Sequence, residues 1–239
     1  MSGIDIPWLY VGQKFSTFCW HYEDLMLYSI NYSHWGKPKL WYGVPLADRE
    51  KFEKVAKSKV ALLFKEDPNI LMDIVTMIKP THFANSGVRV RKTLQMPGEY
   101  IMTFPGSYHA GFSTGLNIGE ACNFMSKSWL KHGVACQDIY RKTREKIGVF
   151  PMEWIVTQNI LAIDKTGLDL ETKRALVEEF KIMLRNEKGY RQDMEEKFEQ
   201  ARKGNYEATL MPNRQQVSED AHQCFYCTDF CYLSMIRCS

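Results

Sequence analysis

The sequence predicts a mainly β protein with added helices: a double-stranded β-helix (jelly-roll or cupin) core, with a helical insertion and a helical C-terminal region. One observation is that short stretches rich in aromatic and β-branched residues alternate with Gly- and Pro-containing turns in the first half of the 239-residue chain. Another is that polar residues far apart in the sequence, around His21 and His109, occupy such stretches. Many short strands broken by turns favour two packed antiparallel sheets over a parallel α/β sheet.

Period-two alternation and turn residues delimit the predicted strands. In chain order, these cover residues 17–23, 25–32, 39–45, 88–94, 99–104 and 115–124, with an extended entry segment at 4–12 and a strand-and-turn segment at 103–112. Side chains two residues apart on a strand point to the same face. Three pairs are therefore expected to share a face: His21 with Glu23, Ser29 with Asn31, and Lys39 with Trp41. Trp20 is expected to pack on the opposite face from His21.

Apolar residues at three- and four-residue intervals predict helices in two regions. The first is an insertion at residues 46–78, in which Pro68 suits the first turn of the second helix and Asp67 is a candidate cap. The second region follows the last strand, with helices predicted over residues 126–146, 151–163, 169–185 and 191–203.

The amino-acid composition limits the classes of protein to which the chain can belong. With 45% hydrophobic residues the chain can bury a substantial core, and a net charge of +3 does not by itself indicate a nucleic-acid binder. No apolar run approaches the roughly 18 to 20 residues that span a bilayer, and the N-terminus does not resemble a signal peptide. We therefore expect a soluble intracellular protein without a membrane partner and without direct DNA contact.

His21, Glu23 and His109 are the candidate catalytic and metal-binding residues. Two histidines and one carboxylate form the facial triad that holds non-heme Fe(II) and leaves coordination positions open. A carboxylate in an apolar strand is costly to bury unless it is paired or binds a metal. Zinc is the competing occupant, but three ligands with open positions and the nearby Lys39 favour iron and a bidentate keto acid.

Four segments carry a resemblance to a known family. They cover residues 19–24, 28–32, 38–45 and 104–112. In order and spacing they are similar to motifs of the JmjC domain, the iron- and 2-oxoglutarate-dependent oxygenase module of histone lysine demethylases. This resemblance runs over residues 7–140. It implies Fe(II) held by the triad, 2-oxoglutarate as co-substrate, O₂ as oxidant, and hydroxylation of a lysine N-methyl group that is released as formaldehyde.

The resemblance assigns roles to further residues. Lys39 would bind the distal carboxylate of 2-oxoglutarate, with Ser29 and Asn31 as hydrogen-bonding partners. The remaining assignments are Phe18 and Trp41 along the co-substrate, Asn123 in the pocket wall, and Trp8 and Tyr10 near the substrate entrance. Strict alternation places Phe18 on the opposite face from His21, so its assignment predicts an irregular strand.

The tail of the chain indicates a branch of the family. Cys224 and Cys227 form a C-x-x-C pair that suits zinc in an intracellular protein. Residues 223–234 are similar to the opening of the zinc finger that follows the JmjC domain in the JARID subfamily. Three regions are thus predicted: a JmjC jelly-roll catalytic domain at 1–140, a helical region at 141–212, and a truncated zinc-finger start with an incomplete zinc site at 213–239.

The subfamily resemblance implies a function in chromatin. Its members act on the methylated fourth-residue lysine of the histone H3 tail, so the expected partners are this tail and chromatin complexes in the nucleus. It also implies a fragment, because the finger's remaining ligands would lie beyond Ser239. Two alternatives stay open: a catalytically weak histone-binding or scaffold module, and a protein hydroxylase of the same fold.

Overall fold

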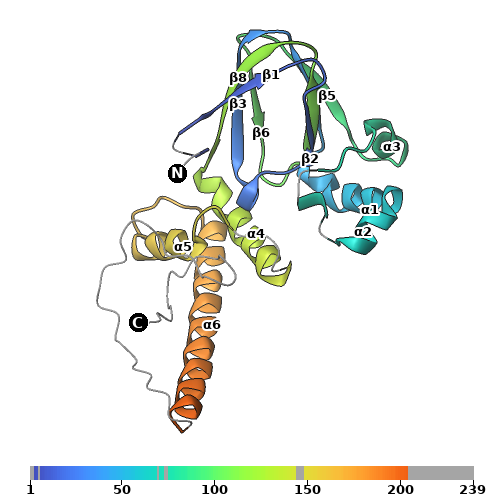
Figure 1. Cartoon of the computed structure of the whole chain (residues 1–239). Helices are drawn as coiled ribbons and strands as arrows, with labels where there is room; N and C mark the ends of the chain where they lie inside the picture. The colour runs from blue at the N-terminus through green and yellow to red at the C-terminus, as the bar shows by residue number, and fades with distance from the viewer. Residues whose placement is uncertain (1–2, 5, 69, 73–74, 144–147, 204–239) are drawn as a thin grey trace. The chain divides into compact units, whose positions relative to one another are not determined.

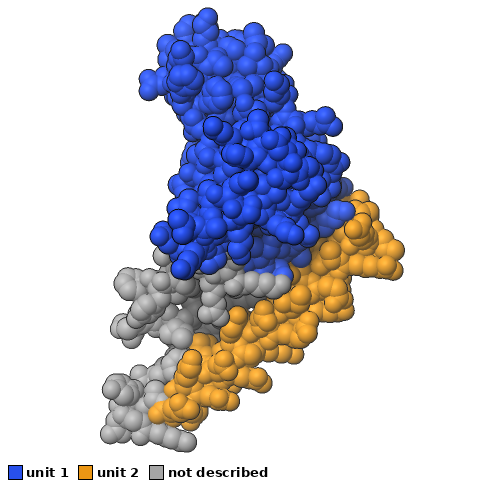
Figure 2. Space-filling view, turned by 90° about the vertical axis from the view of Figure 1, so that its right-hand side faces the viewer, with its two compact units in different colours: residues 1–146 blue, residues 147–239 orange. Residues whose placement is uncertain are grey.

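The computed structural model describes residues 3–4, 6–68, 70–72, 75–143 and 148–203. The chain forms two compact units, residues 1–146 and residues 147–239, which Figure 2 shows in different colours. The domain boundaries predicted at residues 140 and 212 remain predictions. The predicted zinc-finger start at 213–239 lies outside the described residues.

Two four-stranded sheets form the body of the first unit (Figure 1). One sheet has the strand order β1-β8-β3-β6 and the other β2-β7-β4-β5, and the paired strands are antiparallel. The strands are β1 Trp8–Gly12, β2 Thr17–His21, β3 Tyr28–Gly36, β4 Lys39–Gly43, β5 Arg91–Gln95, β6 Tyr100–Thr103, β7 His109–Ser113 and β8 Asn117–Phe124. Because the chain passes back and forth between the two sheets, the fold is the predicted jelly roll, with helices added.

Central strands bring residues from distant parts of the sequence together. In the first sheet, β3 lies between β6 and β8, and Ser29 is directly opposite Asn123. In the second sheet, β4 lies between β7 and β5, and Lys39 is directly opposite Gln95. Directly opposed side chains on antiparallel strands are near neighbours, so these registers set which polar groups meet inside the jelly roll.

The helical insertion differs from its prediction. Its helices are η2 Leu46–Asp48, α1 Arg49–Lys59, α2 Ala61–Glu66, η3 Ile70–Met72 and α3 Pro80–Asn85. In the described residues, Pro68 is followed by the three-residue 3-10 helix η3, which begins at Ile70, and not by an α-helix with Pro68 in its first turn. Asp67 ends α2 in an extended conformation, which is the conformation favoured for a residue before proline. The following α-helix begins at Pro80, where proline is tolerated because the first helical amide has no partner within the helix.

Aromatic packing joins the insertion to β2. The ring of Trp20 is fully buried and lies 5.1 Å from the ring centroid of Phe52 in α1 and 5.3 Å from that of Phe83 in α3. Its indole N–H donates a hydrogen bond to the carbonyl oxygen of Ile78 at 2.8 Å. Figure 1 shows α1, α2 and α3 grouped beside β2. The predicted packing of Trp20 is confirmed, and by alternation its burial directs the next side chain, His21, to the inner face.

Helices follow the last strand. The first unit ends with η4 Lys127–Trp129 and α4 Leu130–Thr143, and the second unit contains α5 Met152–Leu161 and α6 Leu170–Lys203. The prediction of separate helices at 169–185 and 191–203 was wrong, because α6 is continuous over 34 residues. Gly189 lies inside it at a cost of about 1 kcal/mol relative to alanine, which its helix-forming neighbours outweigh. None of the described helices has both the length and the apolar character that crossing a membrane requires.

Candidate metal centre

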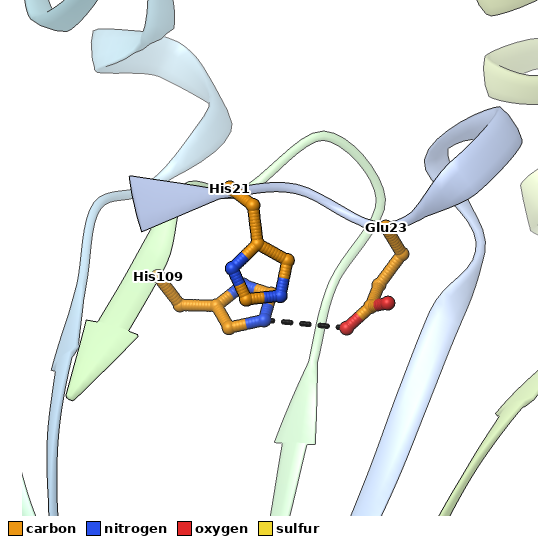
Figure 3. Close-up of side chains that lie close together, drawn as sticks. All are labelled: His21, Glu23 and His109. Atoms are coloured by element: carbon orange, nitrogen blue, oxygen red, sulfur yellow. Dashed lines mark ion pairs between the residues drawn. The ribbon is translucent and has the colours of Figure 1, made fainter. Parts of the chain in front are cut away.

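Three side chains converge where β2 ends and β7 begins. His21, the last residue of β2, is directly opposite His109, the first residue of β7, and their ring centroids are 4.2 Å apart. Glu23 follows two residues after His21. Candidate ligand atoms of the three residues lie within 4.8 Å of one another, and Figure 3 shows the side chains directed toward one another. The structure thus brings together the three residues that the sequence singled out.

The position of Glu23 differs from its prediction in one respect. The strand predicted over residues 17–23 ends at His21, and Glu23 directly precedes the 3-10 turn η1, Asp24–Met26. The strand predicted to begin at residue 25 instead begins at Tyr28. Glu23 reaches the two histidines because of this turn and not because of strand alternation.

Backbone carbonyls fix the orientation of both imidazoles. Nδ1 of His21 is 2.7 Å from the carbonyl oxygen of Cys19, and Nδ1 of His109 is 3.0 Å from the carbonyl oxygen of Ser107. A carbonyl oxygen only accepts, so Nδ1 is the protonated nitrogen in both rings. Nε2 is then the nitrogen that coordinates a metal, and this supporting hydrogen bond is a usual feature of histidine ligands.

Glu23 is held as a carboxylate. Its Oε1 is 3.2 Å from Nε2 of His109, and its Oε2 accepts a hydrogen bond from Nδ2 of Asn123 at 2.9 Å. Burial alone would raise the pKa of Glu23, but the hydrogen bonds from His109 and Asn123, with the positive charge of the imidazoles, lower this pKa to about 2. The group is therefore ionised at neutral pH, the form in which a carboxylate binds a metal.

An irregularity in β2 brings Phe18 to the site. The register between β2 and β7 shifts between Phe18 and His21, as the assignment of Phe18 to the pocket required. The ring of Phe18 lies 4.5 Å from that of Trp41, and the ring of Trp41 is stacked at 6.1 Å from His109. Gly111 leaves the room for this arrangement, because a Cβ there would come within 2.5 Å of the Phe18 ring. These aromatic rings form an apolar wall beside the candidate metal ligands.

Lys39 is buried inside the jelly roll. Its Nζ donates a hydrogen bond to Oδ1 of Asn117 at 2.5 Å, and burial lowers its pKa. The Cα of Gly119 is close by, since a Cβ built there would lie 3.3 Å from Nζ of Lys39 and 3.8 Å from Oδ1 of Asn31. A buried ammonium can form charge-assisted hydrogen bonds with a carboxylate.

Three residues of this polar interior were missed from the sequence. Asn117 is fully buried against Lys39, and Thr103 lies 2.6 Å from Ser29 through their hydroxyl oxygens. Gln95 is also fully buried and accepts a hydrogen bond from the indole N–H of Trp41 at 2.9 Å. Each stands at an end of its strand, where sequence alone cannot distinguish an inward polar residue from a solvated one.

Gln95 also ties Asn31 to this network. Its Nε2 donates to both the backbone oxygen and Oδ1 of Asn31 at 3.1 Å. Predicted site residues Ser29, Asn31, Lys39 and Trp41 thus each hydrogen-bond to one of the missed residues.

A cavity of about 430 Å³ borders the site. Trp41, Thr103 and His109 contribute to its wall, and the basic residues Arg89 and Arg91 also line it. Its size accommodates a small organic ligand next to His109.

Helix α1 anchors the residues adjacent to the ligands. Arg49 donates to the hydroxyl of Tyr22 at 3.2 Å and to Oε1 of Glu53 at 2.9 Å, and the hydroxyl of Tyr108 donates to the same Oε1 at 3.1 Å. Tyr22 lies between His21 and Glu23 in the chain, and Tyr108 precedes His109. The insertion therefore supports both ligand-bearing segments from outside the sheet.

Trp8 and Tyr10 lie on β1, half exposed, with ring centroids 6.4 Å apart. Burial and, next, the negative charge of Glu23 raise the pKa of Tyr10. Cys224 and Cys227 lie outside the described residues.

A jelly roll with two histidines and one carboxylate converging at one end of its sheets defines the class of cupin-type metal-site proteins. Residues 8–124 match the family model described as "JmjC domain, hydroxylase", and the chain belongs to the JmjC-domain family. Over all 239 residues it is 41% identical to "Lysine-specific demethylase 5D" of Homo sapiens and of Pan troglodytes. The chain spans 15% of the length of these curated relatives.

Proposed function

We propose that this chain is the catalytic part of an Fe(II)- and 2-oxoglutarate-dependent dioxygenase that removes methyl groups from histone lysines. The observation that carries the proposal is the convergence of His21, Glu23 and His109, with ligand atoms within 4.8 Å of one another. The match to the JmjC domain and the identity to two proteins named as lysine-specific demethylases support this choice of reaction.

The donor set fits Fe(II). Two imidazoles that coordinate through Nε2, and one ionised carboxylate, would supply the ligands of the facial triad. When bound, the iron would supply the oxidising chemistry that couples O₂ and 2-oxoglutarate to hydroxylation of a methyl C–H bond. His21, His109 and Glu23 would hold the metal, and positions on it would remain open for the co-substrates. Zinc accepts the same donors, so the identity of the metal is part of the experiment below.

The co-substrate would lie between the metal ligands and Lys39. In this proposal, the ammonium of Lys39 pairs with the distal carboxylate of 2-oxoglutarate, and Asn31 adds an amide beside it. Phe18 and Trp41 exclude water from one side with their rings. Asn123 keeps the Glu23 carboxylate in position by donating to Oε2.

The substrate would approach past Trp8 and Tyr10. Aromatic faces attract methylated ammonium groups, and the rings of Trp8 and Tyr10 lie side by side on β1. A hydroxymethyl group on the lysine nitrogen then breaks down to the amine and formaldehyde. The resemblance to the JARID subfamily supports the fourth-residue lysine of the histone H3 tail as the substrate, and with it a place in chromatin complexes in the nucleus. In this proposal the C-terminal Cys224 and Cys227 contribute to a zinc site.

The test is to titrate the protein with Fe(II) and 2-oxoglutarate without oxygen, and then add air and methylated H3-tail peptides. Mass spectrometry should show loss of methyl groups from the fourth lysine, while peptides methylated at other lysines and the His109→Ala variant serve as controls. Tight peptide binding without turnover would favour a histone-binding module, and a retained hydroxyl group would favour a protein hydroxylase. Stoichiometric binding of zinc with rejection of Fe(II) would contradict the proposal.

A further inference from the structure

Glu23 is held differently from the other two candidate ligands. His21 and His109 are both strand residues, paired directly with each other in the β2–β7 ladder. Glu23 lies beyond the end of β2, so no ladder hydrogen bond fixes its backbone in the sheet. The direction of its carboxylate therefore depends on the turn that follows, residues 24–26.

That turn has a strained backbone. Leu25 has φ 50° and ψ 26°, and Met26 has φ 50°. Both lie in the left-handed region, which is unfavourable for a residue with a side chain because Cβ comes too close to the following carbonyl oxygen. Both residues have buried side chains. Neither is a glycine, the residue that adopts this conformation without steric cost. Two strained residues in succession persist only where the surrounding structure holds them.

Two side chains hold the peptide groups of Leu25. Its backbone N–H donates to the hydroxyl oxygen of Tyr140 at 3.1 Å, and its carbonyl oxygen accepts from the indole N–H of Trp129 at 2.9 Å. Leu25 and Trp129 are fully buried, and Tyr140 is 4% exposed. Neither bond can be replaced by water without opening the core, so each is worth more than a surface hydrogen bond.

We propose that Tyr140 and Trp129 are positioning residues for the metal centre, which fix the strained turn so that the carboxylate of Glu23 faces the two histidines. The inference rests on the proposed metal site. Trp129 ends η4 and Tyr140 belongs to α4, so both follow residue 124, where the match to the JmjC domain ends. A determinant of metal binding thus comes from the helices beyond the domain.

Releasing the turn would move Glu23, because the two flanking strands are fixed in the sheets and the turn between them is not. The β2–β7 ladder fixes the chain up to His21, and the β3–β8 ladder fixes it again from Tyr28. When Leu25 relaxes toward a right-handed conformation, the segment between these anchors rearranges, and Glu23 moves relative to the imidazoles. Groups that orient a metal ligand through one hydrogen bond typically change metal affinity 10- to 100-fold.

The experiment compares Tyr140→Phe and Trp129→Phe with the unmodified chain. Co(II), which substitutes for Fe(II) and has visible absorption that reports coordination geometry, is titrated into each protein without oxygen. Tyr28→Phe is the matched control, because it removes a hydroxyl that lies 3.0 Å from Oγ of Ser128 but does not contact the turn. We expect Tyr140→Phe to weaken Co(II) binding about tenfold and to alter the spectrum, while Tyr28→Phe leaves both unchanged.

Unfolding in urea without metal separates positioning from stability. If Tyr140→Phe and Trp129→Phe unfold more easily but bind Co(II) with the original affinity and spectrum, the two residues only stabilise the fold and the inference is wrong. If Trp129→Phe does not fold, Tyr140→Phe decides, because it keeps the ring and removes one hydroxyl. If the unmodified chain does not bind Co(II), the proposed metal centre fails, and the inference fails with it.

Discussion

His21 and His109 face each other across the β2–β7 ladder, with their ring centroids 4.2 Å apart and each Nδ1 bound to a carbonyl two residues earlier in the chain. Because ladder and carbonyls hold both rings before any metal arrives, binding needs little reorganisation. Preorganised ligands bind more tightly because less conformational entropy is lost.

The first prediction is that metal stabilises the folded chain through these residues. At a free metal concentration of one hundred times Kd, unfolding should cost about 2.7 kcal/mol more than without metal. His109→Ala should abolish this gain, because it removes one of three ligands. Urea unfolding with and without Fe(II), under nitrogen, measures this gain in the free energy of unfolding. His34→Ala is the control, since His34 pairs with Glu120 on the surface. An undiminished gain in His109→Ala would contradict the site.

The second prediction concerns Lys39. Replacing it with alanine removes the cation proposed to bind 2-oxoglutarate and should raise the half-saturating 2-oxoglutarate concentration at least tenfold, as expected for a charge-assisted hydrogen bond. Fe(II) affinity should stay the same, because Lys39 is not a metal ligand. Lys37→Ala, an exposed lysine in the preceding turn, is the control. Unchanged 2-oxoglutarate dependence in Lys39→Ala would remove the residue from the site.

Sequence reasoning located the strands and the three converging side chains because both leave local signals. Alternation, with glycine and proline at turns, marks each strand, and His21 and Glu23 are close in the chain. It did not locate the end of β2, because the left-handed turn at Leu25 exists through contacts with Trp129 and Tyr140, more than one hundred residues away.

The missed residues have the same cause. Asn117 and Gln95 are polar residues at strand ends, and only the sheet register shows that they face inward against Lys39 and Trp41. The continuous α6 was missed because Gly189 suggests a break that the long helix tolerates. Local pattern therefore predicts the elements, and tertiary contacts decide where they end.

A third prediction follows from the pKa of Asp48. Hydrogen bonds from the side chain and backbone of Arg89 lower this pKa from 3.8 to about 2. A depressed pKa in the folded state contributes stability that is present above the ordinary value and is lost as pH falls toward 2. Asp48→Asn should therefore lose more stability at pH 6 than at pH 2.5, measured by urea unfolding without metal. Glu50→Gln, nearby in α1, is the control. An equal loss of stability in Asp48→Asn at both pH values would contradict the proposed contribution of the lowered Asp48 pKa.

The last prediction concerns the space between Gly119 and the ammonium group of Lys39. A Cβ added at Gly119 would lie 3.3 Å from Nζ of Lys39 and 3.1 Å from the carbonyl oxygen of Tyr32. Both contacts are tight, and the lysine side chain is the neighbour that can move. Gly119→Ala should therefore displace the ammonium and raise the half-saturating concentration of 2-oxoglutarate several-fold, while overpacking costs about 1 kcal/mol of stability.

Gly189→Ala is the control for this variant, because a Cβ on Gly189 in α6 meets no atom within 4 Å. It should leave the 2-oxoglutarate dependence and the Co(II) spectrum unchanged. Gly119→Ala should also keep the Co(II) spectrum of the unmodified chain, since Gly119 contacts Lys39 and not the metal ligands. If Gly119→Ala instead changed the spectrum and left the 2-oxoglutarate dependence intact, the small acid would lie elsewhere, and Lys39 would serve the fold through Asn117 alone.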